Sequence, residues 1–408
     1  MTASKSSFNI IPLEYDIFVG MDVDKRSIAV TVYDHNGKVD SFKTSNSAVK
    51  IINYARKHFA EKRVAFAYEV GPTGYGLYDQ LTEAGYKCLV VSSSSVPTPS
   101  RSRVKTNRLD SQRIAETLRG GELKSVRVPS KKYRHLRHLI HLYNTVSKHS
   151  RNCKCRIKAL FLLEEIPYPN MSKTDHWSNN TIRRLETMEL EAPLRFKLDV
   201  LLEDLRHFRQ QILRVKKEIR RFCRSDQDLA DSICYLMSIP GIGWTIASHL
   251  LARIGDWRNL NNVRELGDFI GLTPWENSTG DDVKKGNITR AGDSRLRNML
   301  IEGAWTASAR DPEMKEFYHR IFSRHPQDRA ARKAVVAVAR KMTMRIFRVL
   351  KDRRLYIPAE KYKINHRPSD KKRRPTAPKD ASTLCRTRKY VLKRDKKYSP
   401  VFAGSLAR

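Results

Sequence analysis

Short apolar runs dominate the chain between residues 15 and 125. Two strand-like runs, Tyr15 to Val23 and Ser27 to Tyr33, are followed by an Asn-Gly pair, which favours a hairpin turn into a third strand near Ser41 to Thr44. Apolar positions at helical spacing then alternate with further short runs. The expected elements are a helix capped by Asn46 and ending near Phe59, a strand from Arg63 to Val70, a helix from Tyr75 to Ala84 and a strand from Lys87 to Ser92.

This order of elements predicts a fold class. An antiparallel three-strand meander followed by alternating helices and strands is the order of the ribonuclease-H-like α/β fold. We therefore expect residues 15–125 to form one α/β domain. In such a sheet the first and fourth strands are neighbours, so residues near their ends lie at one edge.

A different periodicity follows in residues 129–230, which we expect to form long, charged helices. Apolar residues recur there in alternating steps of four and three, the heptad repeat of a coiled coil. The seam fits either a second copy of the chain, giving a dimer or tetramer, or the helix around Leu136, Ile140 and Tyr143. A heptad repeat leaves both alternatives open. The seam residues are Leu194, Leu198, Leu201, Leu205, Phe208, Ile212, Val215, Ile219 and Phe222.

Residues 231–350 are expected to form a compact, mostly helical domain. Its turn at Pro240 to Trp244 is similar to a helix-hairpin-helix turn, in which Gly241 and Gly243 let backbone N–H groups approach a phosphate. A tight turn between two helices is an equal alternative. The tail, residues 351–408, holds 19 Lys and Arg against 5 Asp and Glu, and we expect it to become ordered on nucleic acid.

The net charge of the chain indicates what kind of molecule it binds. The formal net charge of +36 indicates a polyanion, with nucleic acid the first candidate. No run of about 18 apolar residues and no signal-peptide order is present, so a membrane role is not expected. Six dispersed cysteines indicate reduced thiols. We predict a cytoplasmic, nucleoid-associated bacterial protein.

Four oxygen-bearing residues form a candidate metal site. Asp22 and Glu69 lie toward the ends of the first and fourth expected strands, and Asn107 lies three residues before Asp110, which opens a helical stretch. Such oxygen ligands suit Mg²⁺, which supports phosphodiester chemistry. Taken singly, each acid is more readily a cap, a turn residue or a salt-bridge partner, and it is their combined placement at strand ends that favours a metal site. Four cations stand beside them, Arg101, Arg103, Lys105 and Arg108.

A second candidate lies between Gly271 and Leu300, where no strong periodicity appears until Ser294, so an ordered loop is expected. Ser278 or Thr279 could attack a phosphodiester because nearby cations stabilise an alkoxide-like nucleophile. Ordinary loop chemistry is the alternative. The cations are Lys284, Lys285, Arg290, Arg295 and Arg297.

Six segments together resemble one protein family. From about Asp16 to Arg310 the chain is similar to the DEDD transposases of the RNA-bridged insertion sequences, whose relatives include the Piv-type DNA invertases. The segments are GMDVDKRS around Asp22, AYEVGPTGYGL around Glu69, VKTNRLDSQRIA around Asp110, SIPGIGWTIASHLLARIGD from Ser238, GLTPWENSTG from Gly271 and GNITRAGDSRLRNML from Gly286.

The resemblance implies a RuvC-like domain, a coiled coil and a transposase domain whose serine becomes covalently linked to DNA. Asp22, Glu69 and Asp110 would then be metal ligands and Ser278 the nucleophile, with Thr279 as the alternative. A structured bridge RNA would pair with donor and target DNA. One position departs from the family pattern, since Asn107 stands where an acid is expected. A hydrolytic nuclease such as a junction resolvase, or an inactive nucleic-acid-binding relative, are the rival interpretations.

Overall fold

The structure is a computed structural model that describes residues 10–71, 73–92, 106–168, 177–279 and 282–358. The chain divides into two compact units, Met1–Val128 and Pro129–Arg408, which are described separately below. No helix among the described residues is both long and apolar enough to cross a membrane. Most of the predicted tail, from residue 359 onward, lies outside the described residues.

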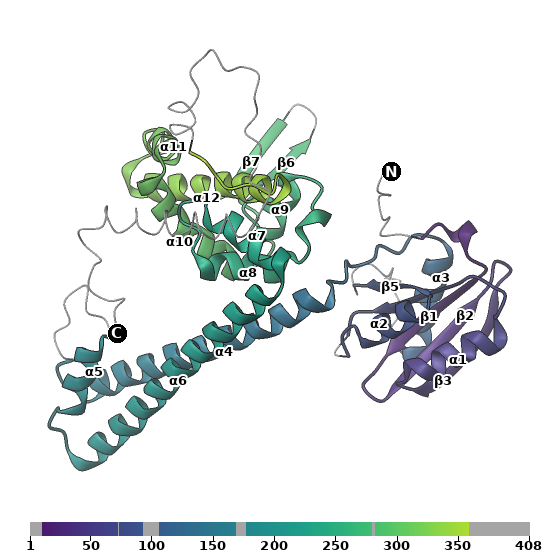
Figure 1. The fold of residues 1–408 in the computed structure, drawn as a ribbon, viewed down its shortest axis with the longest axis horizontal. Coiled ribbons are helices and arrows are strands. Elements are labelled where there is room, and N and C mark those ends of the chain that lie inside the picture. The colour runs from purple at the N-terminus through teal and green to yellow at the C-terminus, as the bar shows by residue number, and fades with distance from the viewer. Residues whose placement is uncertain (1–9, 72, 93–105, 169–176, 280–281, 359–408) are drawn as a thin grey trace. The chain divides into compact units, whose positions relative to one another are not determined.

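The first unit is built on a five-stranded mixed sheet with strand order β3-β2-β1-β4-β5 (Figure 1). Strand β1 is antiparallel to β2 and parallel to β4, and β4 is parallel to β5. The predicted adjacency of the first and fourth strands is therefore confirmed. The elements are β1 (Ile17–Val23), β2 (Ser27–Tyr33), β3 (Lys38–Ser45), α1 (Ala48–His58), β4 (Val64–Glu69), α2 (Gly76–Glu83), β5 (Lys87–Val91) and α3 (Asn107–Arg119), after a short 3₁₀ turn at Pro12–Glu14.

Each face of the sheet buries its own apolar cluster. One cluster includes Met21 and Tyr68 and packs on α1 and α2, and the other includes Phe18 and packs on α3. Helix α3 lies directly against β1 at Gly20, where an added Cβ would be 2.3 Å from both the Ala115 nitrogen and the Ser111 oxygen. This close approach fixes the start of α3 above the end of β1.

Two local predictions in this unit are corrected. Asn46 does not cap α1, because Ser47 occupies the N-cap position. The Asn46 amide instead donates to the Asp24 carbonyl at 2.9 Å. Helix α3 begins at Asn107 and not at Asp110, because the Thr106 hydroxyl accepts a hydrogen bond from the Leu109 N–H at 3.3 Å and so caps an earlier first turn.

The second unit is mostly helical, with a single two-stranded sheet among its described residues. Its elements are α4 (Lys131–Leu163), α5 (Asn179–Glu186), α6 (Ala192–Ser225), α7 (Gln227–Met237), α8 (Trp244–Ile254), a 3₁₀ turn (Trp257–Asn259), α9 (Val263–Ile270), β6 (Pro274–Thr279), β7 (Asp282–Ile288), α10 (Ser294–Arg310), α11 (Pro312–Phe322) and α12 (Gln327–Lys351).

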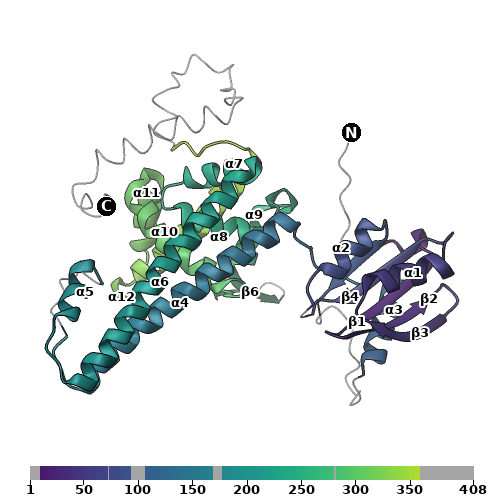
Figure 2. The same ribbon diagram turned by 60° about the horizontal axis from the view of Figure 1, so that its bottom comes forward.

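Helices α4 and α6 lie side by side as a long hairpin in both views (Figures 1 and 2). The heptad seam of α6 faces α4, where Leu198 and Leu205 are fully buried in a cluster with Ile157 and Leu160. The structure thus places the seam against the same chain, the second of the two alternatives. The prediction that this helix joins protomers stays a prediction.

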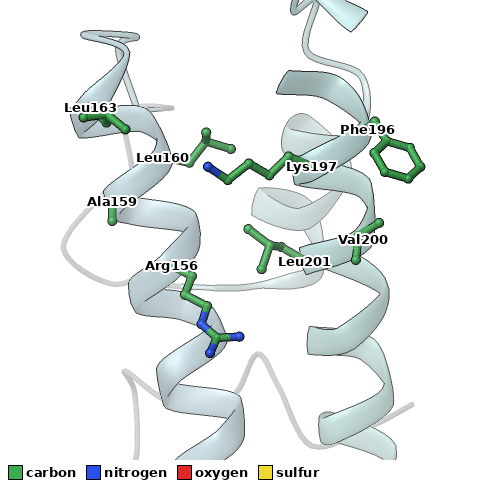
Figure 3. Close-up of a pocket in the computed structure, with 8 residues that line it drawn as sticks. All are labelled: Arg156, Ala159, Leu160, Leu163, Phe196, Lys197, Val200 and Leu201. Atoms are coloured by element: carbon green, nitrogen blue, oxygen red, sulfur yellow. The ribbon is translucent and has the colours of Figure 1, made fainter. Parts of the chain in front are cut away.

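An apolar groove is left between the same two helices (Figure 3). Leu160 and Leu201 point into the space between the helices, whereas Phe196 is 71% exposed. Nothing in the described structure covers this groove, so it carries no functional assignment.

The expected loop between Gly271 and Ser294 contains a β-hairpin. Strands β6 and β7 pair antiparallel, with Ser278 opposite Val283. The loop prediction was wrong because polar residues follow one another along both strands in the sequence, so the apolar alternation that indicates a strand is absent. The predicted start of the next helix at Ser294 is confirmed.

Candidate functional site

Two acids lie at one edge of the five-stranded sheet. Met21 in β1 is opposite Tyr68 in β4, so the next residues, Asp22 and Glu69, lie at the same level of neighbouring parallel strands. Because Met21 and Tyr68 belong to the cluster under α1 and α2, alternation places both acids on the α3 face. Both acids are half-buried. Their expected placement at one edge is therefore confirmed.

The first turn of α3 reaches the same edge. Ser111 lies against Gly20, and Asn107 is one helical turn earlier, toward the end of β1. The Asn107 amide nitrogen donates a hydrogen bond to the Asp24 carboxylate. Because an ionised carboxylate can only accept, the amide nitrogen is the atom that faces Asp24 and the amide oxygen is left for another partner.

Asp110 is engaged within its own helix. Its carboxylate forms an ion pair with the Arg113 guanidinium at 3.2 Å, with both side chains largely buried. No group of three or more His, Cys, Asp or Glu side chains in the described part of the chain is arranged to hold a metal ion. The oxygen donors have the chemistry that suits Mg²⁺. In the structure, Asp110 is paired with Arg113 and is not grouped with Asp22 and Glu69.

The cations expected beside these acids are only partly described. Arg108 lies exposed in the first turn of α3. Arg101, Arg103 and Lys105 lie outside the described residues. Their assignment to nucleic-acid binding stays a prediction.

The β6–β7 hairpin carries the candidate nucleophiles near its turn. Ser278 and Thr279 are the last two residues of β6, opposite Val283 and Asp282. Lys284 and Lys285 lie on β7, opposite Asn277 and Glu276 in the register. The backbone therefore brings two hydroxyl residues and two lysines onto one short ribbon, and their role at a phosphate stays a prediction.

The base of this hairpin is held by Arg297, which is 8% exposed. Its guanidinium donates to the Ile270 carbonyl at 3.1 Å and to the Arg290 carbonyl at 3.2 Å, so it bridges the two ends of the segment. The expectation that Arg297 joins a phosphate-binding surface is wrong, since its hydrogen bonds go to the backbone. Arg290 and Arg295 remain exposed.

Two glycines allow the close backbone approach at the same base. Gly271 has a φ of +74° and Gly292 a φ of +128°, in the region that favours glycine. An added Cβ would lie 2.5 Å from the Ala291 oxygen at Gly271 and 2.4 Å from the Phe269 oxygen at Gly292. The hairpin is therefore fastened by its backbone as well as by Arg297.

The turn at Pro240 to Trp244 is packed against α10. Gly241 has a φ of +89°, and an added Cβ would be 2.1 Å from the Gly303 oxygen. Gly243 has no neighbour within 4 Å and begins α8 without a side-chain cap. The structure thus gives Gly241 the role of a tight interhelical turn, whereas the assignment of Gly243 to a phosphate contact stays a prediction.

Sequence reasoning missed Asp24 and assigned Arg297 to the wrong surface. A signal for Asp24 existed, because it stands two residues after Asp22 in the same segment. Its contact with Asn107 joins residues 83 positions apart, however, and no local pattern reports that.

Comparison with known proteins identifies the family of the chain. The model of the transposase family IS116/IS110/IS902 matches residues 234–319, and a DEDD-type transposase model of IS110 matches residues 19–166. A putative transposase, y4qE, from Sinorhizobium fredii is 32% identical over 295 residues, covering 71% of this chain and 72% of the relative. The transposase of insertion sequence element IS1533 from Leptospira borgpetersenii is 22% identical over 305 residues, covering 71% and 84%.

A further relative is named for DNA inversion. The pilin gene-inverting protein of Moraxella bovis is 25% identical over 154 residues, covering 37% of this chain and 47% of the relative. The two matched models include residues of both units, and the aligned region spans 72% of y4qE. The protein therefore belongs to the IS116/IS110/IS902 family of transposases, enzymes of DNA recombination.

Proposed function

We propose that this transposase cuts and rejoins DNA strands through attack by Ser278, with the oxygen ligands at the edge of the first unit acting on the same phosphate. The observation that carries the proposal is the placement of Asp22 and Glu69 at one level of β1 and β4, on the face that the start of α3 covers. Acids at such an edge, in a chain of this family, support a RuvC-like catalytic unit.

Each residue has a defined part in the reaction. Asp22, Glu69 and Asp110 would hold Mg²⁺ through carboxylate oxygens, and Asn107 would hold it through an amide oxygen. When bound, the ion neutralises charge on the phosphate and its leaving oxygen. Ser278 attacks phosphorus, its hydroxyl proton passes to solvent or a nearby base, and the DNA 3′ oxygen or 5′ oxygen leaves. Rejoining reverses these bond changes with a different DNA end as the attacking group.

The excess of positive charge fits a role in holding nucleic acid by its backbone. A net charge of +36 can neutralise many phosphates of DNA. We further propose that a structured bridge RNA pairs with donor and target DNA and sets the sequence, and that the active species is a homo-oligomer. Salt dependence of binding to RNA and to DNA, measured on the full chain, tests the charge argument.

A covalent adduct tests the proposed nucleophile. The full chain is incubated with Mg²⁺ and labelled DNA bearing an element end, and denaturing gels report protein that retains label. We expect Ser278→Ala to abolish the adduct and Thr279→Ala to keep it, because consecutive strand residues lie on opposite faces. An adduct mapped to Thr279 by mass spectrometry would transfer the role to that residue. A hydrolytic nuclease, the rival function, yields cleaved DNA and no adduct.

The presence of Asn107 where the family pattern has an acid favours the inactive-relative alternative, because a neutral amide binds Mg²⁺ less tightly than a carboxylate. Asn107→Asp restores a fourth acid and should raise the affinity for Mg²⁺. An adduct formed by the native chain and strengthened by this change fits the proposal. An adduct formed only after the change would show that the native chain is catalytically silent.

A further inference from the structure

Trp275 differs from the other tryptophans of the chain in what covers its ring. The sequence has five tryptophans. A cation lies over Trp177, Trp244 and Trp257, and Trp305 packs against Tyr318 with ring centroids 6.0 Å apart. Trp275 is 51% exposed, and no ring or cation of the described residues covers it. An indole with an open face on a charged protein surface is unusual enough to ask what binds it.

The backbone redirects this indole at an irregularity of the hairpin. Between the pairs Pro274–Ile288 and Glu276–Lys285 the register shifts, so that Trp275 on β6 faces two residues of β7, Gly286 and Asn287. Such an irregularity is a β-bulge, which redirects a side chain and commonly adjoins functional positions. Trp275 thus stands at a bulge three residues before Ser278.

Gly286 supports one face of the ring. An added Cβ at Gly286 would be 2.8 Å from Trp275 Cε3, 3.6 Å from Cζ3 and 3.7 Å from Cδ2. The φ of Gly286 is not in the left-handed region, so the backbone does not require glycine there. The contact with the indole does. A glycine inside a strand often marks such a close approach, and here it lets the ring approach the β7 backbone while the tryptophan stays 51% exposed.

Charge decides between a protein and a nucleic acid as the occupant of the open face. Arg290 lies exposed just beyond β7, and Lys284 and Lys285 follow one another along β7. An exposed aromatic ring on a strongly basic protein, here with a formal net charge of +36, suits single-stranded nucleic acid, since bases stack on such rings while cations bind the phosphate backbone.

We propose that Trp275 is a stacking platform for an unpaired nucleobase, in a strand that passes along the β6–β7 hairpin. The base stacks on the open face of the indole while Gly286 supports the other face. The proposal rests on the proposed function only in that nucleic acid reaches this hairpin. It assigns the hairpin a binding role in addition to carrying Ser278.

The test is a binding assay on the full chain without divalent ions, so that no chemistry at Ser278 takes part. Oligonucleotides of one sequence are compared as single-stranded DNA, single-stranded RNA and duplex DNA at several salt concentrations. We expect Trp275→Ala to weaken single-strand binding by about fivefold or more. The slope of affinity against salt should not change, because no cation is removed. If the affinity for single-stranded DNA falls more than that for single-stranded RNA, the stacked base belongs to DNA; the reverse result assigns it to RNA.

Three further variants separate stacking on the ring from a general apolar contact. Trp275→Phe keeps a flat ring and should retain most of the affinity, whereas Trp275→Leu, apolar without a π face, should lose as much as alanine. Gly286→Ala pushes the indole off its support and should give an intermediate loss. Trp305→Ala is the matched control, since Trp305 is 42% exposed in the same unit and packs on Tyr318. Thermal unfolding verifies that each variant is folded.

The proposal is overturned if Trp275→Ala binds single-stranded oligonucleotides with the same affinity as the wild type and as Trp305→Ala. Equal affinity of the leucine and phenylalanine variants would also overturn it, because that outcome fits an apolar contact with protein. Stacking at Trp275 without a serine adduct would contradict only the proposed function. A serine adduct with no effect of Trp275→Ala on binding would contradict only the stacking proposal.

Discussion

The acidic edge of the first unit and the serine hairpin of the second are held in place by different means. Asp22 and Glu69 stand on strands whose neighbours Met21 and Tyr68 are fully buried, under a helix pressed onto Gly20. The hairpin that carries Ser278 is a two-stranded sheet, an element that is marginal by itself. It depends on contacts at its base. A substitution that removes the contacts holding one of these regions should therefore destabilise that region and leave the other unchanged.

The largest effect is expected at Gly20. Gly20→Val places carbon atoms where the α3 backbone already lies, so α3 must move off the sheet, and we expect a loss of about 3 kcal/mol in the free energy of unfolding of the first unit. Denaturant unfolding measures it. Gly76→Ala is the control, because its added Cβ has no neighbour within 4 Å and its φ is ordinary. Equal stability of the two variants would show that α3 does not press on β1.

The matching change in the second unit is Arg297→Met. It removes the hydrogen bonds to the Ile270 and Arg290 carbonyls, and we expect a local loss of about 1–3 kcal/mol. Hydrogen exchange should rise in β6 and β7 and stay unchanged in β1 to β5. The exposed Arg295→Met should leave exchange as it is. A uniform rise over both units would contradict separate support.

Within the first unit, the Asp24 carboxylate accepts a hydrogen bond from the Asn107 amide. Asp24→Ala removes the acceptor that orients the Asn107 amide group, so the Asn107 amide oxygen is no longer held in one direction. We expect the Mg²⁺ concentration for half-maximal adduct to rise roughly tenfold. The Mg²⁺ concentration that gives half of the maximal adduct measures this, together with the Mg²⁺-dependent shift in Tm. Glu61→Ala removes one exposed acid of the same unit and serves as control. Identical responses in both variants would leave Asp24 without a positioning role.

The smallest effect is a pH dependence confined to the second unit. Burial holds the pKa of His249 below its ordinary value of 6.5. The unfolded chain takes up this proton before the folded chain does, so the stability is complete above pH 6.5 and declines as pH falls through the lower folded pKa. We expect a small drop in Tm between pH 7.5 and pH 5.5 that His249→Gln reduces. A Tm in the native chain that rises on acidification would contradict the buried, neutral imidazole.

The sheet of the first unit and the hairpin of the second also differ in how well the sequence predicts them. Strands β1 to β5 were predicted within a few residues because buried strands leave clear apolar runs, and their order placed Asp22 and Glu69 correctly. The β6–β7 hairpin was missed because a polar ribbon leaves no such run. The start of α3 was predicted too late because Thr106, a cap outside the apolar pattern, fixes it.

Contacts between distant elements were beyond local reasoning. The heptad pattern of α6 predicted a seam, but the partner of that seam became known only from its packing on α4. Arg297 was grouped with surface cations because a sequence shows its charge and not the two carbonyls that it bonds. Asp24 and Asn107 meet for the same kind of reason.

The proposed reaction requires that oxygen ligands of the first unit and a hydroxyl of the second act on one phosphate. The most direct test measures the yield of covalent serine adduct from the variant Asp22→Asn, which leaves Ser278 and the second unit unaltered. We predict that this variant binds DNA as the native chain does and forms no detectable serine adduct in Mg²⁺. A normal yield of serine adduct from Asp22→Asn would contradict the claim, because the serine would then act without the acidic edge.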